Sequence, residues 1–199
     1  NAASYVTFKK ITFKRTGSNS IGAVVHILNG TNHVTFTNCQ MIGIPFPSVS
    51  AFTYNIFSDG GVNSYNSFLN NYIKLGSVSM MYSGLYSFHQ TGTVIQGNVF
   101  DSAYNNAVQL TYNDNVILKG NTFRTIRTPV TGNFDMGLFD CDNAINVTGN
   151  YFYDTNTTFA IGLSRGCTAT LSNPGFISNN FIMKTTGTIK RIIGPVVDV

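Results

Sequence analysis

Three carboxylates in one short stretch are the residues best suited to chemistry. Asp135, Asp140 and Asp142 lie within the segment Asn133-Phe-Asp-Met-Gly-Leu-Phe-Asp-Cys-Asp142. Asp140 and Asp142 are two residues apart, so their side chains share a face on an extended strand. Because hydrolysis of a glycosidic bond uses two carboxyl groups about 5 to 9.5 Å apart, this stretch is a candidate acid–base centre.

The same carboxylates have a structural interpretation, which the sequence favours. Subtracting the local repeat of 29 residues places Asp140 and Asp142 over Thr111 and Asn113, with Arg165 near them on the next coil. Asp142 is then the turn residue equivalent to Asn113, and Asp140 solvates the end of a strand. Arg165 is retained as a candidate catalytic cation.

His89 and two tyrosines complete the candidate site. His89 is expected in the column of Tyr112 and Cys141, near the Asp140 pair, so it is the histidine to test first as an acid or base. Exposed aromatic rings are stacking platforms for sugars, and Tyr86 and Tyr112 are candidates. The histidines have no metal-ligand spacing to one another, so no metal site and no cofactor are predicted.

Asp101 and Arg124 occupy one column in adjacent coils, with Tyr153 next. A polysaccharide lyase would need a Lys or Arg base on one face of the protein. A stacked structural ion pair is the simpler interpretation of Asp101 and Arg124, and it would contribute about 1 kcal/mol at most if exposed.

The composition favours strands and turns. Only 10% of the residues are charged, and all eight carboxylates are Asp, which prefers turns to helices. The net charge of +4 is spread along the chain, and no nucleic-acid-binding motif occurs, so no nucleic-acid partner is expected. No apolar run approaches 18 residues, so no membrane span is expected. The three cysteines cannot all pair within the chain and are expected to be small apolar fillers.

One segment recurs through the chain: a short apolar-alternating strand, a small or polar residue, Asn, any residue and an aromatic. The Asn column is aligned as Ile11, Cys39, Asn70, Asn98, Asn121, Asn150 and Asn179, at spacings of 23 to 31 residues. The residues two positions later are Phe13, Met41, Tyr72, Phe100, Phe123, Phe152 and Phe181. A repeat of this length with a strand signal predicts a solenoid.

A parallel β-helix accounts for both columns, because each coil places equivalent residues about 4.8 Å apart. The aromatic column would stack inside the rod, and the amides would form a ladder capped by Ile11 and Cys39. We expect one all-β domain over residues 1–199, a segment of a longer chain, with about seven coils. Right-handed winding is the default for parallel crossovers.

The strand-x-Gly-Asn-x-Phe pattern resembles the parallel β-helix repeats of the pectin-lyase-like superfamily. The phrase Ala3-Ser-Tyr-Val-Thr-Phe-Lys-Lys-Ile-Thr-Phe13 is similar to phrases in large secreted bacterial surface proteins. The superfamily includes polysaccharide lyases, glycoside hydrolases and non-catalytic adhesin stalks, so the resemblance implies the fold and leaves the activity open. The hydrolase signatures Asn-Thr-Asp, Asp-Asp and Gly-His-Gly are missing from the sequence.

Two interpretations follow. The favoured one is a non-catalytic, extracellular or cell-surface module of an adhesin-like protein, which contacts glycans and is joined to further domains of the same chain. The alternative is a polysaccharide lyase or glycoside hydrolase that uses the residues of the candidate site.

Overall fold

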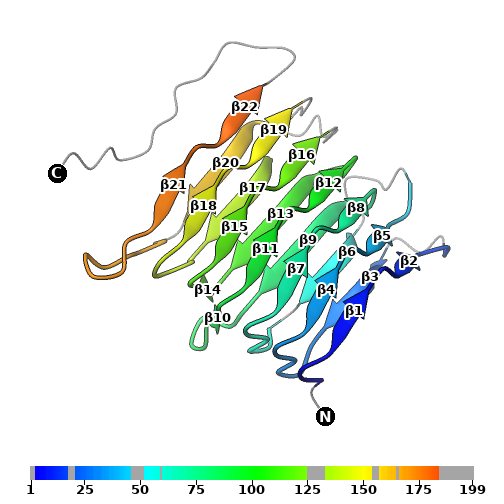
Figure 1. The fold of residues 1–199 in the computed structure, drawn as a ribbon, viewed down its shortest axis with the longest axis horizontal. Coiled ribbons are helices and arrows are strands. Elements are labelled where there is room, and N and C mark those ends of the chain that lie inside the picture. Colours follow the sequence, from blue (N-terminus) through cyan, green and yellow to red (C-terminus); the bar gives the residue numbers. More distant parts are fainter. Residues whose placement is uncertain are drawn as a thin grey trace.

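The computed structural model shows an all-β parallel solenoid of about six turns (Figure 1). It describes residues 3–17, 21–45, 52–58, 60–124, 133–153, 157–164 and 166–183. Within these ranges there is no helix, and so none with the length and apolarity needed to cross a membrane. The predicted fold class is confirmed.

Each full turn contributes one strand to each of three parallel sheets. The first sheet contains, in spatial order, β1 (Thr7–Lys9), β4 (Thr35–Thr37), β7 (Ser67–Leu69), β11 (Val94–Gln96), β15 (Ile117–Lys119), β18 (Asn146–Thr148) and β21 (Phe176–Ser178). The second contains β2 (Thr12–Lys14), β5 (Gln40–Ile42), β8 (Tyr72–Lys74), β12 (Val99–Asp101), β16 (Thr122–Arg124), β19 (Tyr151–Tyr153) and β22 (Phe181–Met183). The third contains β3 (Ile21–Ile27), β6 (Phe52–Ser58), β9 (Val78–Ser83), β13 (Asn106–Thr111), β17 (Phe134–Phe139) and β20 (Phe159–Ser164).

A fourth, two-stranded parallel sheet pairs β10 (Gln90–Thr91) with β14 (Asn113–Asp114). These strands follow β9 and β13 and precede β11 and β15, so they lie at the corner between the third sheet and the first. This corner carries the candidate site.

The core consists of apolar columns that run along the solenoid. In the first sheet, Phe36 stacks on Phe68 with ring centroids 5.6 Å apart. In the second, Phe123 stacks on Phe100 at 5.1 Å and on Phe152 at 4.6 Å. These five rings are buried, and burying one such side chain contributes about 1.5 to 3 kcal/mol. The predicted inward stack is confirmed for Phe100, Phe123 and Phe152.

An asparagine ladder, made of Asn71, Asn98, Asn121, Asn150 and Asn180, runs along the bend between the first and second sheets. The Oδ1 atom of each member accepts the side-chain amide of the preceding member, at 2.9 to 3.1 Å, wherever one exists. It also accepts a backbone N–H from the preceding coil. Each Nδ2 donates in addition to a backbone carbonyl. The ladder therefore satisfies buried backbone N–H and C=O groups at this bend.

The predicted alignment of this column is wrong by one residue in two coils. The ladder uses Asn71 and Asn180, whereas Asn70 and Asn179 lie one position earlier with left-handed backbone, at φ of 55° and 54°. Gly fills this position in the three coils that obey the Gly-Asn pattern, and Asn is the non-glycine residue that best tolerates it. In an Asn-Asn pair, the first residue makes the bend and the second enters the ladder.

The aromatic column shifts with the ladder. Ile73 and Ile182 align with the inward Phe residues, in place of the predicted Tyr72 and Phe181. Phe181 instead stacks on Tyr151 with ring centroids 4.8 Å apart. Residues in one strand alternate between faces, so a shift of one residue moves a side chain from the core to the outer surface.

Replacing Asn121 by Leu is expected to lower the free energy of unfolding by about 3 kcal/mol or more, because Asn98 and the carbonyl of Ile95 on one side and Oδ1 of Asn150 on the other lose hydrogen bonds to the Asn121 side chain. Chemical denaturation monitored by circular dichroism measures the change. Gln96→Leu, on the exposed face of β11, is the matched control and should change the value by less than about 0.5 kcal/mol. Equal effects would show that the ladder does not hold the coils.

The corrected alignment predicts opposite outcomes for two neighbouring residues. Asn70→Gly should change stability by less than about 0.5 kcal/mol, since Gly adopts the left-handed conformation easily. Asn71→Gly should cost about 3 kcal/mol, because it removes hydrogen bonds to the coils on both sides. Denaturant midpoints of the two variants give the comparison. A larger loss of stability in Asn70→Gly than in Asn71→Gly would show that Asn70, not Asn71, is the ladder residue.

Candidate functional site

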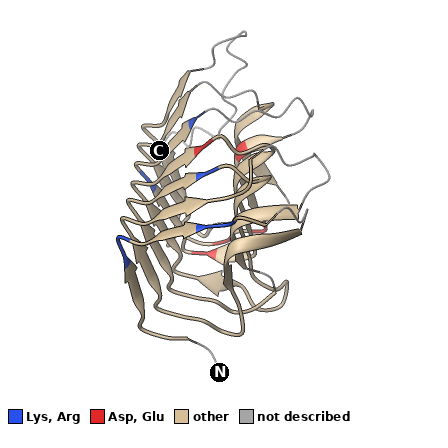
Figure 2. Cartoon of the chain, turned by 90° about the vertical axis from the view of Figure 1, so that its right-hand side faces the viewer, with Lys and Arg blue, Asp and Glu red and all other residues tan. Residues whose placement is uncertain are grey.

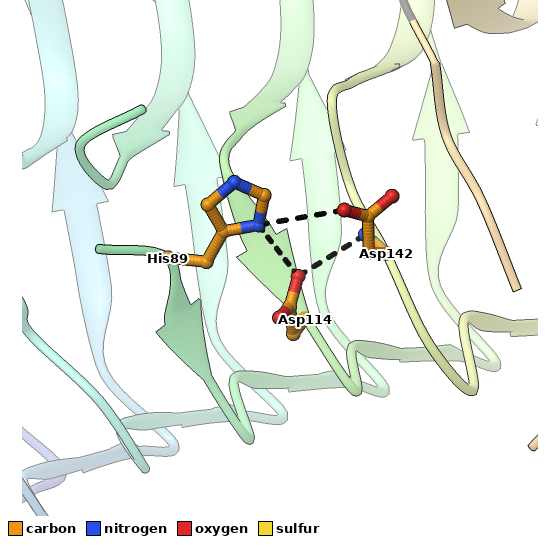
Figure 3. Close-up of side chains that lie close together, drawn as sticks. All are labelled: His89, Asp114 and Asp142. Atoms are coloured by element: carbon orange, nitrogen blue, oxygen red, sulfur yellow. Dashed lines mark hydrogen bonds and ion pairs between the residues drawn. The ribbon is translucent and has the colours of Figure 1, made fainter. Parts of the chain in front are cut away.

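His89, Asp114 and Asp142 converge at the corner that carries β10 and β14 (Figure 3). His89 precedes β10, Asp114 ends β14, and Asp142 follows β17 in the next coil. They are separated in sequence by 25 and 28 residues, about one repeat each. We call these three residues the His–Asp cluster. The structure thus brings together two of the predicted site residues, His89 and Asp142, with a third that was not predicted.

The ring of His89 faces both carboxylates through one nitrogen. Its Nδ1 lies 2.8 Å from Oδ1 of Asp114 and 3.8 Å from Oδ2 of Asp142. The three side chains are 20%, 22% and 28% exposed, in the order His89, Asp114, Asp142. The cluster is therefore partly shielded from water and still open to the surface.

Both carboxylates also hold the backbone of the next coil. Oδ1 of Asp114 accepts the backbone N–H of Asp142 at 3.2 Å. Oδ1 of Asp142 accepts the backbone N–H of Thr168 at 2.8 Å and its hydroxyl at 2.7 Å. Earlier in the same column, Ser64 Oγ accepts the backbone N–H of Thr91 at 3.1 Å. The column therefore has a structural role, which fixes the orientation of the two carboxylates.

The two predicted sugar-stacking tyrosines lie beside the His–Asp cluster. The ring centroid of Tyr112 is 5.4 Å from that of His89, and Tyr86 packs edge-to-face on Tyr112 at 5.8 Å. Tyr86 is 79% exposed. An exposed ring, a partly buried ring and three polar side chains therefore form one continuous surface.

Asp135 and Asp140 do not belong to the cluster. Asp135 lies at the opposite end of β17 from the cluster, is buried and accepts the hydroxyl of Thr157 at 3.0 Å. Asp140 has left-handed backbone, and its N–H donates to the carbonyl of Ser164. Arg165, the remaining predicted catalytic residue, lies outside the described residues.

The predicted alignment of Asp140 and Asp142 is also wrong by one residue. Phe139 pairs with Thr111. Continuing this register places Asp140 beside Tyr112 and Asp142 beside Asp114. The prediction had placed them beside Thr111 and Asn113. The distance between these coils is 28 residues, as Asp114 and Asp142 show, and the assumed value of 29 caused the error. The correct spacing would have identified Asp114 as the neighbour of Asp142.

Cys141 and Cys167 form a second neighbouring pair, in the column next to the cluster. The backbone N–H of Cys141 donates to Sγ of Cys167 at 3.4 Å, and both thiols are free. Their mutual hydrogen bond lowers the pKa of Cys167 and, together with burial, raises that of Cys141. Cys39 and Cys141 are buried, as expected of small core residues, whereas Cys167 is only partly buried.

Asp101 and Arg124 form the predicted ion pair, with Arg124 Nη2 3.0 Å from Asp101 Oδ2. Tyr72 donates its hydroxyl to the same oxygen at 2.6 Å. Burial raises the pKa of Asp101, but hydrogen bonds from Tyr72 and Ser102 and the charge of Arg124 outweigh it, so the pKa is lowered. The pair lies on the second sheet, away from the His–Asp cluster. Figure 2 shows that charged residues are few along the described part of the chain.

No protein-family model, curated protein or solved structure significantly matches this chain.

The lowered pKa of Asp101 predicts that this carboxylate stabilises the fold above its unfolded-state pKa of about 4. Asp101→Asn should lower the free energy of unfolding by about 1 kcal/mol at pH 7. The difference between wild type and variant should shrink as the pH falls below about 4 and through the lowered pKa of the folded state, where the wild-type carboxylate becomes protonated. Denaturant titrations between these pH values test this, and a difference that is constant across the range would contradict the assignment.

Proposed function

We propose that the chain is a non-catalytic, extracellular module that binds carbohydrate at the surface formed by Tyr86, Tyr112 and the His–Asp cluster. The observation that carries the proposal is the exposed ring of Tyr86, which packs on Tyr112 beside the carboxylates. The extracellular location rests on the resemblance of the repeat to those of secreted bacterial surface proteins.

The chemistry of this surface suits a sugar. A pyranose ring presents an apolar face of C–H groups and an edge of hydroxyl groups. Tyr86 offers a large aromatic surface at small entropic cost, since only two side-chain torsions are fixed and the ring already packs against that of Tyr112. Beside it, the carboxylates and the imidazole accept or donate hydrogen bonds. One stacking ring next to fixed polar groups supports recognition of a glycan.

The arrangement of the acidic residues supports a binding role over a catalytic one. Asp114 and Asp142 each use one carboxylate oxygen to hold the backbone of the next coil. A catalytic acid would need to gain and lose a proton at the reacting bond. Asp135 and Asp140, predicted for such a role, lie apart from the cluster.

One observation favours the alternative, a glycoside hydrolase or polysaccharide lyase. The ligand atoms of His89, Asp114 and Asp142 all lie within 4.8 Å of one another. The same limit applies to the carboxylate oxygens of Asp114 and Asp142, and retaining glycosidases have their two carboxyl groups about 5 to 5.5 Å apart. The second candidate is therefore an enzyme that uses Asp114 and Asp142, with His89 as a proton carrier.

Tyr86→Ala is expected to weaken binding to an oligosaccharide ligand, found first on a glycan array, by about tenfold, the equivalent of roughly 1.4 kcal/mol. Titration calorimetry gives the affinities. Tyr5→Ala is the matched control, because Tyr5 is also 79% exposed and stacks on a neighbouring ring, that of His33, but belongs to the first coil. Retention of full affinity by Tyr86→Ala, or an equal loss in both variants, would contradict the proposal.

A turnover assay separates the two candidate functions. The chain should release no reducing ends from a panel of neutral and uronate polysaccharides, and no unsaturated uronate should form. Release that is abolished by Asp114→Asn and Asp142→Asn would replace the binding proposal with the enzyme.

A further inference from the structure

We propose that His89, Asp114 and Asp142 bind one divalent transition-metal ion, with zinc preferred. The proposal does not depend on the proposed glycan contact. It departs from the expectation of no metal site, because the sequence offered no short ligand motif and the three residues meet only through the stacking of coils.

The spacing of the donor atoms fits a single ion. Zinc holds nitrogen and oxygen ligands at about 2.0 to 2.2 Å in tetrahedral geometry, which places ligand atoms about 3.3 Å apart. Nδ1 of His89 lies 2.8 Å from one carboxylate and 3.8 Å from the other, and all three donors fall within 4.8 Å. Movements of about half an ångström, within the reach of side-chain torsions, would bring Nδ1 of His89 to tetrahedral spacing from both carboxylates.

Charge supplies an independent reason for a cation at this place. Two carboxylates from adjacent coils approach the same ring nitrogen, and both are shielded over most of their surface. Among the described residues, no ion pair with a Lys or Arg is present at Asp114 or Asp142. Carboxylates that are close together and partly desolvated repel each other unless a cation or a proton compensates. A dication neutralises both.

The surrounding contacts hold the ligands in place before an ion arrives. Thr168 binds Oδ1 of Asp142 through its N–H and hydroxyl, which leaves Oδ2 as the atom nearer to His89. The backbone N–H of Asp142 fixes Asp114, and the ring of Tyr112 packs against the imidazole. Such contacts outside the ligands typically raise metal affinity by about 10- to 100-fold.

The donor set selects the kind of metal. One imidazole nitrogen and two carboxylates suit zinc and related first-row ions. Calcium prefers six to eight oxygen ligands, and magnesium demands octahedral oxygen coordination. Three protein ligands leave a position for water on an ion held at this surface.

The test is calorimetric titration of the full chain, freed of any affinity tag and stripped with a chelator, with zinc, calcium or magnesium chloride. We expect one equivalent of zinc, bound at least about tenfold more tightly than calcium or magnesium. Asp114→Asn, Asp142→Asn and His89→Gln should each weaken zinc binding by at least about tenfold. Asp140→Asn, a neighbouring carboxylate outside the cluster, should bind zinc as the wild type does.

The variants keep the experiment interpretable. Asn in place of Asp retains an oxygen acceptor for the backbone N–H groups of Asp142 and Thr168, so the fold should survive, which thermal melts without metal verify. Cys167→Ser controls for zinc bound by the nearby thiols and should leave the affinity unchanged. The proposal is overturned by the absence of saturable zinc binding, by unchanged affinity in the three ligand variants, by loss of binding in Cys167→Ser, or by tighter binding of calcium.

Discussion

The hydrogen-bonded register between coils, fixed by the asparagine ladder, is the interaction on which the rest of the structure depends. The ladder amides of Asn71, Asn98, Asn121 and Asn150 bond to the coils on both sides, and successive members of the ladder are 23 to 30 residues apart in sequence. Strand pairing alone would allow a coil to slip by two residues without exchanging its faces. Within the ladder, each side-chain amide bonds to the amide of one particular residue on the adjacent coil, so the ladder selects one register.

Every surface column follows from this register. Neighbouring strands of the third sheet pair in parallel from β3 to β20, and β10 and β14 at the corner pair in parallel as well. His89, Asp114 and Asp142 meet because they occupy neighbouring columns on three successive coils. If one coil shifted by a single residue against its neighbours, these three side chains would no longer meet. The same shift in the coil of Ile73 would move this side chain out of the core. Stability and the surface site thus depend on the same register of the coils.

The sequence carried most of the information on the fold and less on the site. Period, strand signal and the Gly-Asn-x-Phe pattern were sufficient for the parallel solenoid, because inward positions tolerate few residue types. The errors fell where two residues could take one role. In the Asn-Asn pairs at Asn70 and Asn179, either residue suits the bend or the ladder by type, and only the three-dimensional register separates them.

The site was harder to predict because corner segments vary in length from coil to coil. Because the local repeat was taken one residue too long, Asn113 was predicted as the neighbour of Asp142, and Asp114 was missed. Two of the predicted residues met, His89 and Asp142, while Asp135 proved to be buried beside Thr157. Outward residues are not constrained by the core, so their roles depend on which neighbours the register provides.

The most direct test of the central claim, that coil register assembles one site from three repeats, is a crystal structure grown with zinc and measured at the zinc absorption edge. The account predicts one anomalous peak about 2.0 to 2.2 Å from Nδ1 of His89 and from an oxygen of both Asp114 and Asp142. It also predicts Asn71, not Asn70, within the ladder. A peak at the cysteine pair, no peak, or a ladder built on Asn70 would contradict it.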